Sequence, residues 1–172
     1  MKKYIFIGIS FAFAVMGCNS KEGNNTGESS IQLPYTATYP NVFNNNVSDS
    51  DLLTVMNSYK AWETGDMKGL RATMGDSMYV NGADGFKFAG LTDSLMKDWQ
   101  KMRDSLSSVK ITMAVWLKNH SVKDSSNFIN VWYKEIDTYK TGKVDSANYE
   151  DDNQLKNGKI LWFSSHKQVL KP

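Results

Sequence analysis

Three residues near the C-terminal end carry side chains used in acid–base chemistry: Tyr149, Asp151 and His166. The pair Asn157-Gly158 between two β-rich segments predicts a two-residue hairpin turn. An uninterrupted register from that turn places Asp151 opposite Ser164 and Tyr149 opposite His166, all on one sheet face. An aspartate diagonal to a histidine, beside a tyrosine, could orient an imidazole for general acid–base catalysis.

The same three residues also fit a polar rim or a dimer face of the sheet. This interpretation is favoured, because a single bulge in either strand would break the register. We therefore expect His166, near the end of the last strand, to be exposed to solvent and not in contact with Asp151.

Other chemical signals are weaker. His120 lies in a polar stretch typical of a surface turn, and alternate members of Glu150-Asp151-Asp152 point to opposite faces of a strand. The sequence has one cysteine, no histidine pair at metal-ligand spacing, no glycine-rich phosphate loop and no G-x-S-x-G motif. It therefore predicts neither a metal site nor a bound cofactor.

The single cysteine, Cys18, ends a short leader. Lys2 and Lys3 form a basic start, Tyr4 to Met16 form an apolar run, and Gly17 precedes the cysteine. The run is shorter than the roughly 20 residues that a membrane-spanning helix needs. The pattern indicates a bacterial lipoprotein signal, residues 1–17, with cleavage before Cys18 and acylation of its thiol.

This leader predicts a protein held in the bacterial cell envelope by its lipid, with the outer membrane favoured because Asn19 follows the cysteine. Without Lys2 and Lys3, 18 basic residues balance 18 acidic ones. Such a neutral chain, with no basic stripe, argues against a nucleic-acid partner.

Residues 18–47 are expected to be the acylated cysteine and a flexible tether. Residues 19–30 contain no apolar side chain, and such a segment cannot bury enough surface to fold. Residues 31–47 carry apolar side chains interrupted by Pro34 and Pro40, which fits either disorder or an extended segment lying on the domain.

The folded domain is expected to span residues 48–172. Ser48 and Asp51 resemble a capping pair, Gly65 ends the first helix and Asp66 caps a second one that ends at Gly75. A third helix follows from the apolar spacing of residues 91–106. Alternating or β-rich runs predict strands at residues 78–81, 86–88, 109–117, 128–139, 144–155 and 160–170.

Within this order, residues 58–70 (SYKAWETGDMKGL), residues 74–81 (MGDSMYVN) and Asn157-Gly158-Lys159-Ile160 resemble nuclear transport factor 2-like proteins, including their polyketide-cyclase (SnoaL-like) branch. The resemblance covers about residues 48–170. It implies an α+β fold: a cone-shaped, curved antiparallel sheet wrapped around three helices, with a pocket at the open end. Members include isomerases, cyclases, hydrolases and binding domains, so the fold alone does not select an activity.

The resemblance also bears on the site. The steroid-isomerase branch carries a general-base aspartate at a position that matches Asn81, which cannot accept a proton at neutral pH. A cone pocket lined by aromatic side chains would suit a flat apolar ligand. The expected lining residues are Tyr59, Trp62, Tyr79, Asn81, Trp99 and Trp162.

The sequence thus favours a lipid-anchored, non-catalytic domain that binds a small apolar or aromatic ligand or forms a homodimer through its sheet face. The alternative is a small cofactor-free enzyme of the cyclase or isomerase type that uses the cone pocket.

Overall fold

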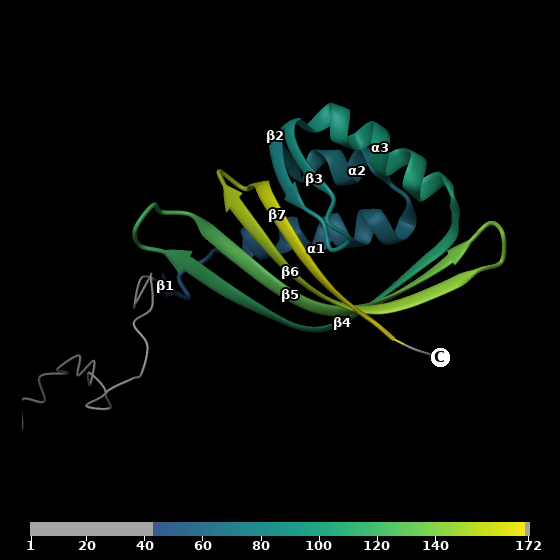
Figure 1. Ribbon diagram of the computed structural model, residues 1–172. Helices are drawn as coiled ribbons and strands as arrows, with labels where there is room; N and C mark the ends of the chain where they lie inside the picture. The colour runs from purple at the N-terminus through teal and green to yellow at the C-terminus, as the bar shows by residue number, and fades with distance from the viewer. Residues whose placement is uncertain (1–42, 171–172) are drawn as a thin grey trace, which may run out of the picture. The chain divides into compact units, whose positions relative to one another are not determined.

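A computed structural model describes residues 43–170, and in this range three helices and seven strands follow one another in the predicted order, with a short strand added at the front (Figure 1). The elements are β1 (Phe43–Asn44), α1 (Asp49–Thr64), α2 (Met67–Ala72), β2 (Met74–Asn81), β3 (Lys87–Leu91), α3 (Thr92–Asp104), β4 (Leu106–Ser121), β5 (Asn127–Tyr139), β6 (Val144–Lys156) and β7 (Lys159–Val169).

The first two helices begin and end at the residues that the sequence marks. The Ser48 hydroxyl accepts the Asp51 N–H at 3.1 Å, which caps α1. Gly65 ends the helix with φ of 76°, a left-handed conformation that favours glycine. Asp66 caps α2 by accepting the Gly69 N–H at 2.8 Å. The second helix is shorter than predicted, because it ends at Ala72 and β2 begins at Met74.

The strands form one seven-stranded sheet in the order β1-β4-β5-β6-β7-β2-β3. All pairs are antiparallel except β2 and β7, which run parallel. The expectation of an entirely antiparallel sheet is therefore wrong at this pair. The pairing of Met74 with Ile160 explains the direction. Both strands start at the same end of the sheet. β2 begins just after α2, and β7 begins just after the β6–β7 turn.

The turn between β6 and β7 has the predicted form. Asn157 and Gly158 have φ of 54° and 71°, as a type I′ turn requires, and Lys156 pairs with Lys159. Past this point the register shifts, because Leu155 pairs with Ile160 and Gln154 pairs with Trp162. One residue, Leu161, is left over as a bulge.

A glycine makes room for this bulge. A Cβ atom at position 75 would lie 2.3 Å from Leu161 Cδ2, closer than two carbon atoms can approach. Gly75 on β2 therefore accommodates the side chain that the bulge turns toward it. The consequence is a shift by one residue along the rest of β7, so that Asp151 pairs with Ser165 and Glu150 pairs with His166.

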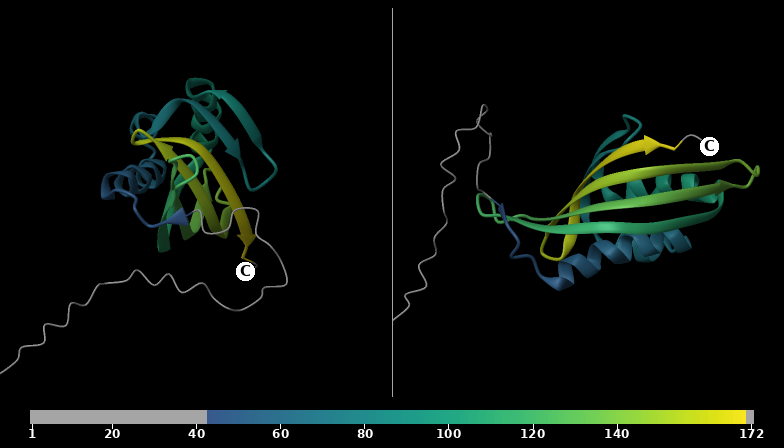
Figure 2. Two further views of the ribbon diagram at one scale, coloured as in Figure 1. Left: turned by 90° about the vertical axis from the view of Figure 1, so that its left-hand side faces the viewer. Right: turned by 90° about the horizontal axis from the view of Figure 1, so that it is seen from below.

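The three helices lie on one side of the curved sheet (Figures 1 and 2). We call this side the inner face and the other side the outer face. On β5, Ile129, Val131, Tyr133 and Glu135 are buried and belong to the inner face. Together with side chains from the helices and β2 they form the core of the domain. Its fully buried members include Val55, Met78, Leu95, Leu155 and Ile160.

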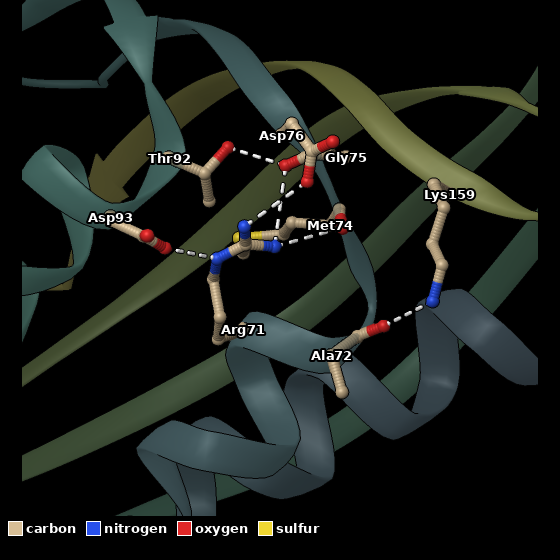
Figure 3. A network of polar contacts seen from close by, with 8 residues as sticks. All are labelled: Arg71, Ala72, Met74, Gly75, Asp76, Thr92, Asp93 and Lys159. Carbon is tan, nitrogen blue, oxygen red and sulfur yellow. Dashed lines mark hydrogen bonds and ion pairs between the residues drawn. The ribbon is translucent and has the colours of Figure 1, made fainter.

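A polar network fastens α2 to its neighbours (Figure 3). The Arg71 guanidinium donates to Asp93 at 2.6 Å and to the carbonyl of Gly75 at 3.5 Å, which links α2 to α3 and β2. Lys159 donates to the carbonyl of Ala72 at 2.6 Å, which links β7 to the end of α2. The acidic partners are exposed, so the network contributes more to geometry than to stability.

The domain starts slightly before the predicted boundary. Phe43 pairs with Ser121 on β4, and Val47 is buried in the core. Cys18 and most of the predicted tether lie outside the described residues. Among residues 43–170, no helix has the length and apolar character needed to cross a membrane.

Candidate functional site

A cavity of about 240 Å³ lies between the inner face of the sheet, α1, α3 and the β2–β3 turn. Its wall is mostly aromatic and apolar. One strongly buried carboxyl, that of Glu135 on β5, also faces the cavity. The aromatic side chains of the wall are Tyr59, Trp62, Phe86, Trp99, Tyr133, Tyr149 and Phe163.

The helices supply the aromatic residues that the sequence predicts for the pocket. Tyr59 and Trp62 are three positions apart on α1, so they lie on the same side of that helix. Trp99 projects from α3, where its ring meets Phe163 of β7 edge-on at a centroid distance of 6.4 Å. These three predicted residues therefore line the cavity.

Three other predicted lining residues do not. Tyr79 and Asn81 on β2 are exposed, because Met78 and Val80 are the residues of this strand that turn inward. Trp162 pairs with Tyr79 and shares the outer face with it, because the bulge in β7 reverses the expected alternation. The Asn81 side chain thus does not reach the cavity, and its lack of a carboxylate says nothing about chemistry inside it.

The structure also separates the predicted acid–base residues. Asp151 is fully buried on the inner face, whereas His166 is exposed and pairs with Glu150 on the outer face. Tyr149 lines the cavity but pairs with Lys167 instead of His166. The predicted register is therefore wrong by one residue, and an Asp151–His166 pair does not form. His166 is exposed, as expected.

Asp151 instead holds two tyrosines. Tyr59 and Tyr133 each donate a hydrogen bond of 2.8 Å to its Oδ2 atom, and Asn153 donates to the Tyr59 oxygen at 3.2 Å. The Oδ1 atom is buried without a hydrogen bond of standard geometry. Burial raises the pKa of Asp151 to about 6, against the lowering effect of the nearby hydroxyls, that of Ser165 included.

The tyrosines of this network form a stacked wall. The Tyr59 and Tyr133 rings meet edge-on with centroids 5.0 Å apart, and Tyr133 and Tyr149 stack at 5.3 Å. Burial, and then the charge of Asp151, raise the pKa of the Tyr59 and Tyr133 hydroxyls well above the usual value. Both remain neutral donors, so Asp151 serves to orient aromatic side chains at the cavity.

Glu135 is the buried carboxyl on the cavity wall. Burial raises its pKa to about 8, and the negative charges of Asp137 and Asp151 act in the same direction, while a hydrogen bond from Trp62 opposes them. Burial also raises the pKa of Asp137. The carboxyl of Glu135 therefore holds a proton at neutral pH and can donate it.

Sequence reasoning missed Glu135 and Tyr133, although a signal was present. Ile129, Val131, Tyr133 and Glu135 occupy alternate positions of one strand, and the first three are apolar or aromatic. A carboxyl in the buried phase of a strand is unusual unless it has a partner or a role. Among residues 43–170, no group of three His, Cys, Asp or Glu side chains is arranged to hold a metal ion.

Comparisons with known proteins identify the fold. No protein-family model matches the chain, and no curated protein matches it. Several solved structures, however, match its fold. A protein of unknown function from Burkholderia pseudomallei, described as NTF2-like (nuclear transport factor 2-like), is 17% identical with a TM-score of 0.58, over 71% of this chain and 92% of that one.

Two enzymes are similar to the same extent. A Delta 5-3-ketosteroid isomerase from Mycobacterium sp. is 15% identical, with a TM-score of 0.57 over 70% of this chain and 98% of that one. An LEH-like epoxide hydrolase from M. tuberculosis is 9% identical, with a TM-score of 0.59 over 70% of this chain and 84% of that one. The domain therefore has the nuclear transport factor 2-like fold, which confirms the predicted α+β cone.

Proposed function

We propose that this nuclear transport factor 2-like domain binds a small, largely apolar molecule in its cavity. The observation that carries the proposal is the wall itself, in which seven aromatic rings surround a hollow that contains one strongly buried carboxyl. Ligand sites are typically apolar concavities with a few polar groups that orient the ligand. A core without such a role would close around these rings, because interiors are packed to high density.

The volume limits the size of the ligand. A water molecule occupies about 30 Å³ in the liquid, so a cavity of about 240 Å³ equals roughly eight water molecules. Pockets for drug-sized ligands begin at about 300 Å³. A molecule with one ring and a short substituent fits this space, and a multi-ring molecule would have to open it.

A pair of tryptophan variants tests the proposal. Trp99→Ala removes part of the wall, and Trp162→Ala removes the same side chain from the outer face. Calorimetric titration of the full chain with 2-phenylethanol should show binding that the first variant weakens and the second leaves unchanged. Native mass spectrometry of the purified chain would identify a retained molecule. Equal binding in both variants, or none in the unmodified protein, would contradict the proposal.

A second function, catalysis without a cofactor, is favoured by one specific observation. The raised pKa of Glu135, about 8, places a buried proton donor against the cavity. Solved proteins with this fold include an isomerase and an epoxide hydrolase, but a shared fold does not transfer their chemistry. If small ketones or epoxides are turned over, Glu135→Gln should slow the reaction by roughly 10²–10⁴-fold.

Binding without catalysis remains the first proposal, because the cavity residues do not assemble a nucleophile with a base. The Ser58 hydroxyl on the wall donates to the carbonyl of Val55 at 2.7 Å. Asp151 is occupied by two tyrosine hydroxyls and does not line the cavity. Within the described range, no histidine faces the cavity.

We also propose that the chain is tethered to the bacterial envelope through a lipid on Cys18, with the outer membrane favoured. The basic start, the short apolar run and the Gly17-Cys18 pair support this. Cys18→Ala should abolish incorporation of radiolabelled palmitate. Undiminished labelling of the variant would contradict the proposal.

A homodimer through the outer face is a further proposal about partners. Tyr79, Val115 and Leu117 are large side chains on this face that are about half or more exposed. Sedimentation of the full chain would show the dimer, and Leu117→Asp should convert it to a monomer. A native chain that sediments as a monomer at micromolar concentration would contradict this proposal.

A further inference from the structure

The wall of the cavity carries acidic side chains and no basic ones. Among the described residues that line it, Glu135 and Asp84 are acids, and there is no lysine, arginine or histidine. The other polar contributors are neutral hydroxyls, an amide and aromatic rings. The faces of aromatic rings are themselves electron-rich. Because Glu135 holds a proton while the cavity is empty, the negative potential at the wall comes from the exposed Asp84 and from the electron-rich ring faces.

Two further carboxyls stand close to this wall. Asp137 follows Glu135 by two positions on β5 and shares its face, and Asp151 contacts two of the wall tyrosines. The charges of both act on Glu135. The Asp137 and Glu135 carboxyls interact with each other, and one oxygen of Asp137, Oδ1, is buried without a hydrogen bond of standard geometry. Within the protein, these charges are compensated only in part.

The nearest basic groups are engaged outside the cavity. Arg103 donates to the carbonyls of Trp62 and Glu63 at 3.0 and 3.1 Å. Lys167 lies 5.7 Å from the centroid of the Tyr149 ring. Both affect Asp137, but neither lines the cavity. The position of Lys167 shows that the Tyr149 ring accepts a cation against its face.

We infer that the ligand is an organic cation, a protonated amine or quaternary ammonium group on a small apolar or aromatic body. This inference rests on the proposed ligand-binding function and names the class of ligand. Its cationic group would lie against Glu135 and the tyrosine rings, and its apolar body would lie against Trp62, Trp99 and Phe163. Aromatic cages are a general means of binding ammonium ions. A cation beside Glu135 lowers the pKa of this carboxyl, so that its proton is released on binding and the carboxylate becomes a charged partner.

The same arrangement disfavours the alternatives. An anion would meet the charge of Asp84 on the wall and those of Asp137 and Asp151 behind it, with no basic side chain on the wall itself. A neutral molecule of equal shape would make the same apolar contacts but would gain no ion pair. The structure therefore predicts an order of affinity: cation first, neutral molecule second, anion last.

A series of three probes of similar shape tests this order. The full chain is titrated calorimetrically at neutral pH with 2-phenylethylammonium, 2-phenylethanol and phenylacetate. The ammonium probe should bind about tenfold more tightly than the alcohol, and phenylacetate should not bind measurably. Glu135→Gln should remove this tenfold advantage, so that the ammonium probe and the alcohol bind this variant with similar affinity. The matched control is Glu150→Gln on the outer face, where the side chain is exposed, and it should change neither affinity.

The outcomes separate this inference from the proposal on which it rests. If the alcohol binds and Trp99→Ala weakens it, but the ammonium probe binds no better, the cation inference is wrong and the ligand-binding function stands. Binding of phenylacetate, or an ammonium preference that survives Glu135→Gln, also overturns the inference. If none of the three probes binds, both ideas fail. The order of affinities in the unmodified protein decides the question even if the Glu135 variant does not fold.

Discussion

Replacing Glu135 by glutamine should change how the stability of the domain depends on pH. The pKa of this carboxyl is raised from the ordinary value of 4.5 to about 8, chiefly by burial. The native state therefore keeps a proton that the unfolded state has lost. In this range the free energy of unfolding must fall as the pH rises, because deprotonation favours the unfolded chain.

The size of the effect follows from the same two values. Each pH unit at which the native state holds one more proton than the unfolded state costs about 1.4 kcal/mol. Between pH 6 and pH 8 the native carboxyl loses its proton only toward the upper end. The unmodified protein should thus lose about 2 kcal/mol relative to Glu135→Gln over these two units. At pH 6 the two proteins should differ by less than about 1 kcal/mol, because an amide replaces a protonated acid of similar shape.

Urea unfolding of both proteins at pH 6, 7 and 8, followed by circular dichroism, measures this difference. Other ionisable groups are common to both proteins, and those that do not interact with Glu135 cancel in the comparison. Glu150→Gln on the exposed outer face is the control and should follow the unmodified protein. If Glu135→Gln shows the same pH dependence as the unmodified protein, Glu135 does not hold the extra proton and the argument for a buried donor at the cavity fails.

Three further substitutions test the packing. Trp99→Ala should destabilise the domain by less than the roughly 3–5 kcal/mol expected for a fully buried tryptophan, because this side chain borders the cavity. Urea unfolding measures the loss, and a loss of about 3–5 kcal/mol would assign Trp99 to the core. Tyr133→Phe removes one of the two hydrogen-bond donors to Asp151 and should lower the free energy of unfolding by about 1–3 kcal/mol, measured by thermal unfolding. The control Tyr79→Phe, on the outer face, should not change the stability measurably. Equal losses of stability in the two variants would refute the role of the network. Gly158→Ala should cost about 1 kcal/mol by the same assay, because φ is 71° there, and an unchanged stability would show that the turn relaxes.

Much of the architecture could be predicted because it depends on local interactions. A serine at the start of a helix, a left-handed glycine at its end and an Asn-Gly turn each act within a few residues. Ser48, Gly65 and Asn157-Gly158 therefore take the conformations that their sequence indicates. The helical spacing of Tyr59, Trp62 and Trp99 likewise placed these side chains on the cavity wall.

The errors arose where distant segments decide the geometry. The register of β7 depends on the bulge at Leu161, which Gly75 of another strand accommodates. No pattern within β7 itself reveals this contact. One extra residue reverses the face of every later side chain in the strand. His166 and Trp162 are therefore on the outer face, and the predicted Asp151–His166 pair is absent.

The sequence by itself determined the order of the elements, their capping and the aromatic character of the helix faces, because these properties follow from neighbouring residues. Only the tertiary structure decided which carboxyls become buried and what surrounds them. Asp151 receives hydroxyl groups from α1 and β5, and Glu135 acquires its raised pKa from burial and from the charges of Asp137 and Asp151. The protonation state of a side chain depends on desolvation and on charges brought close by folding. For this reason the candidate site could be identified only from the tertiary structure.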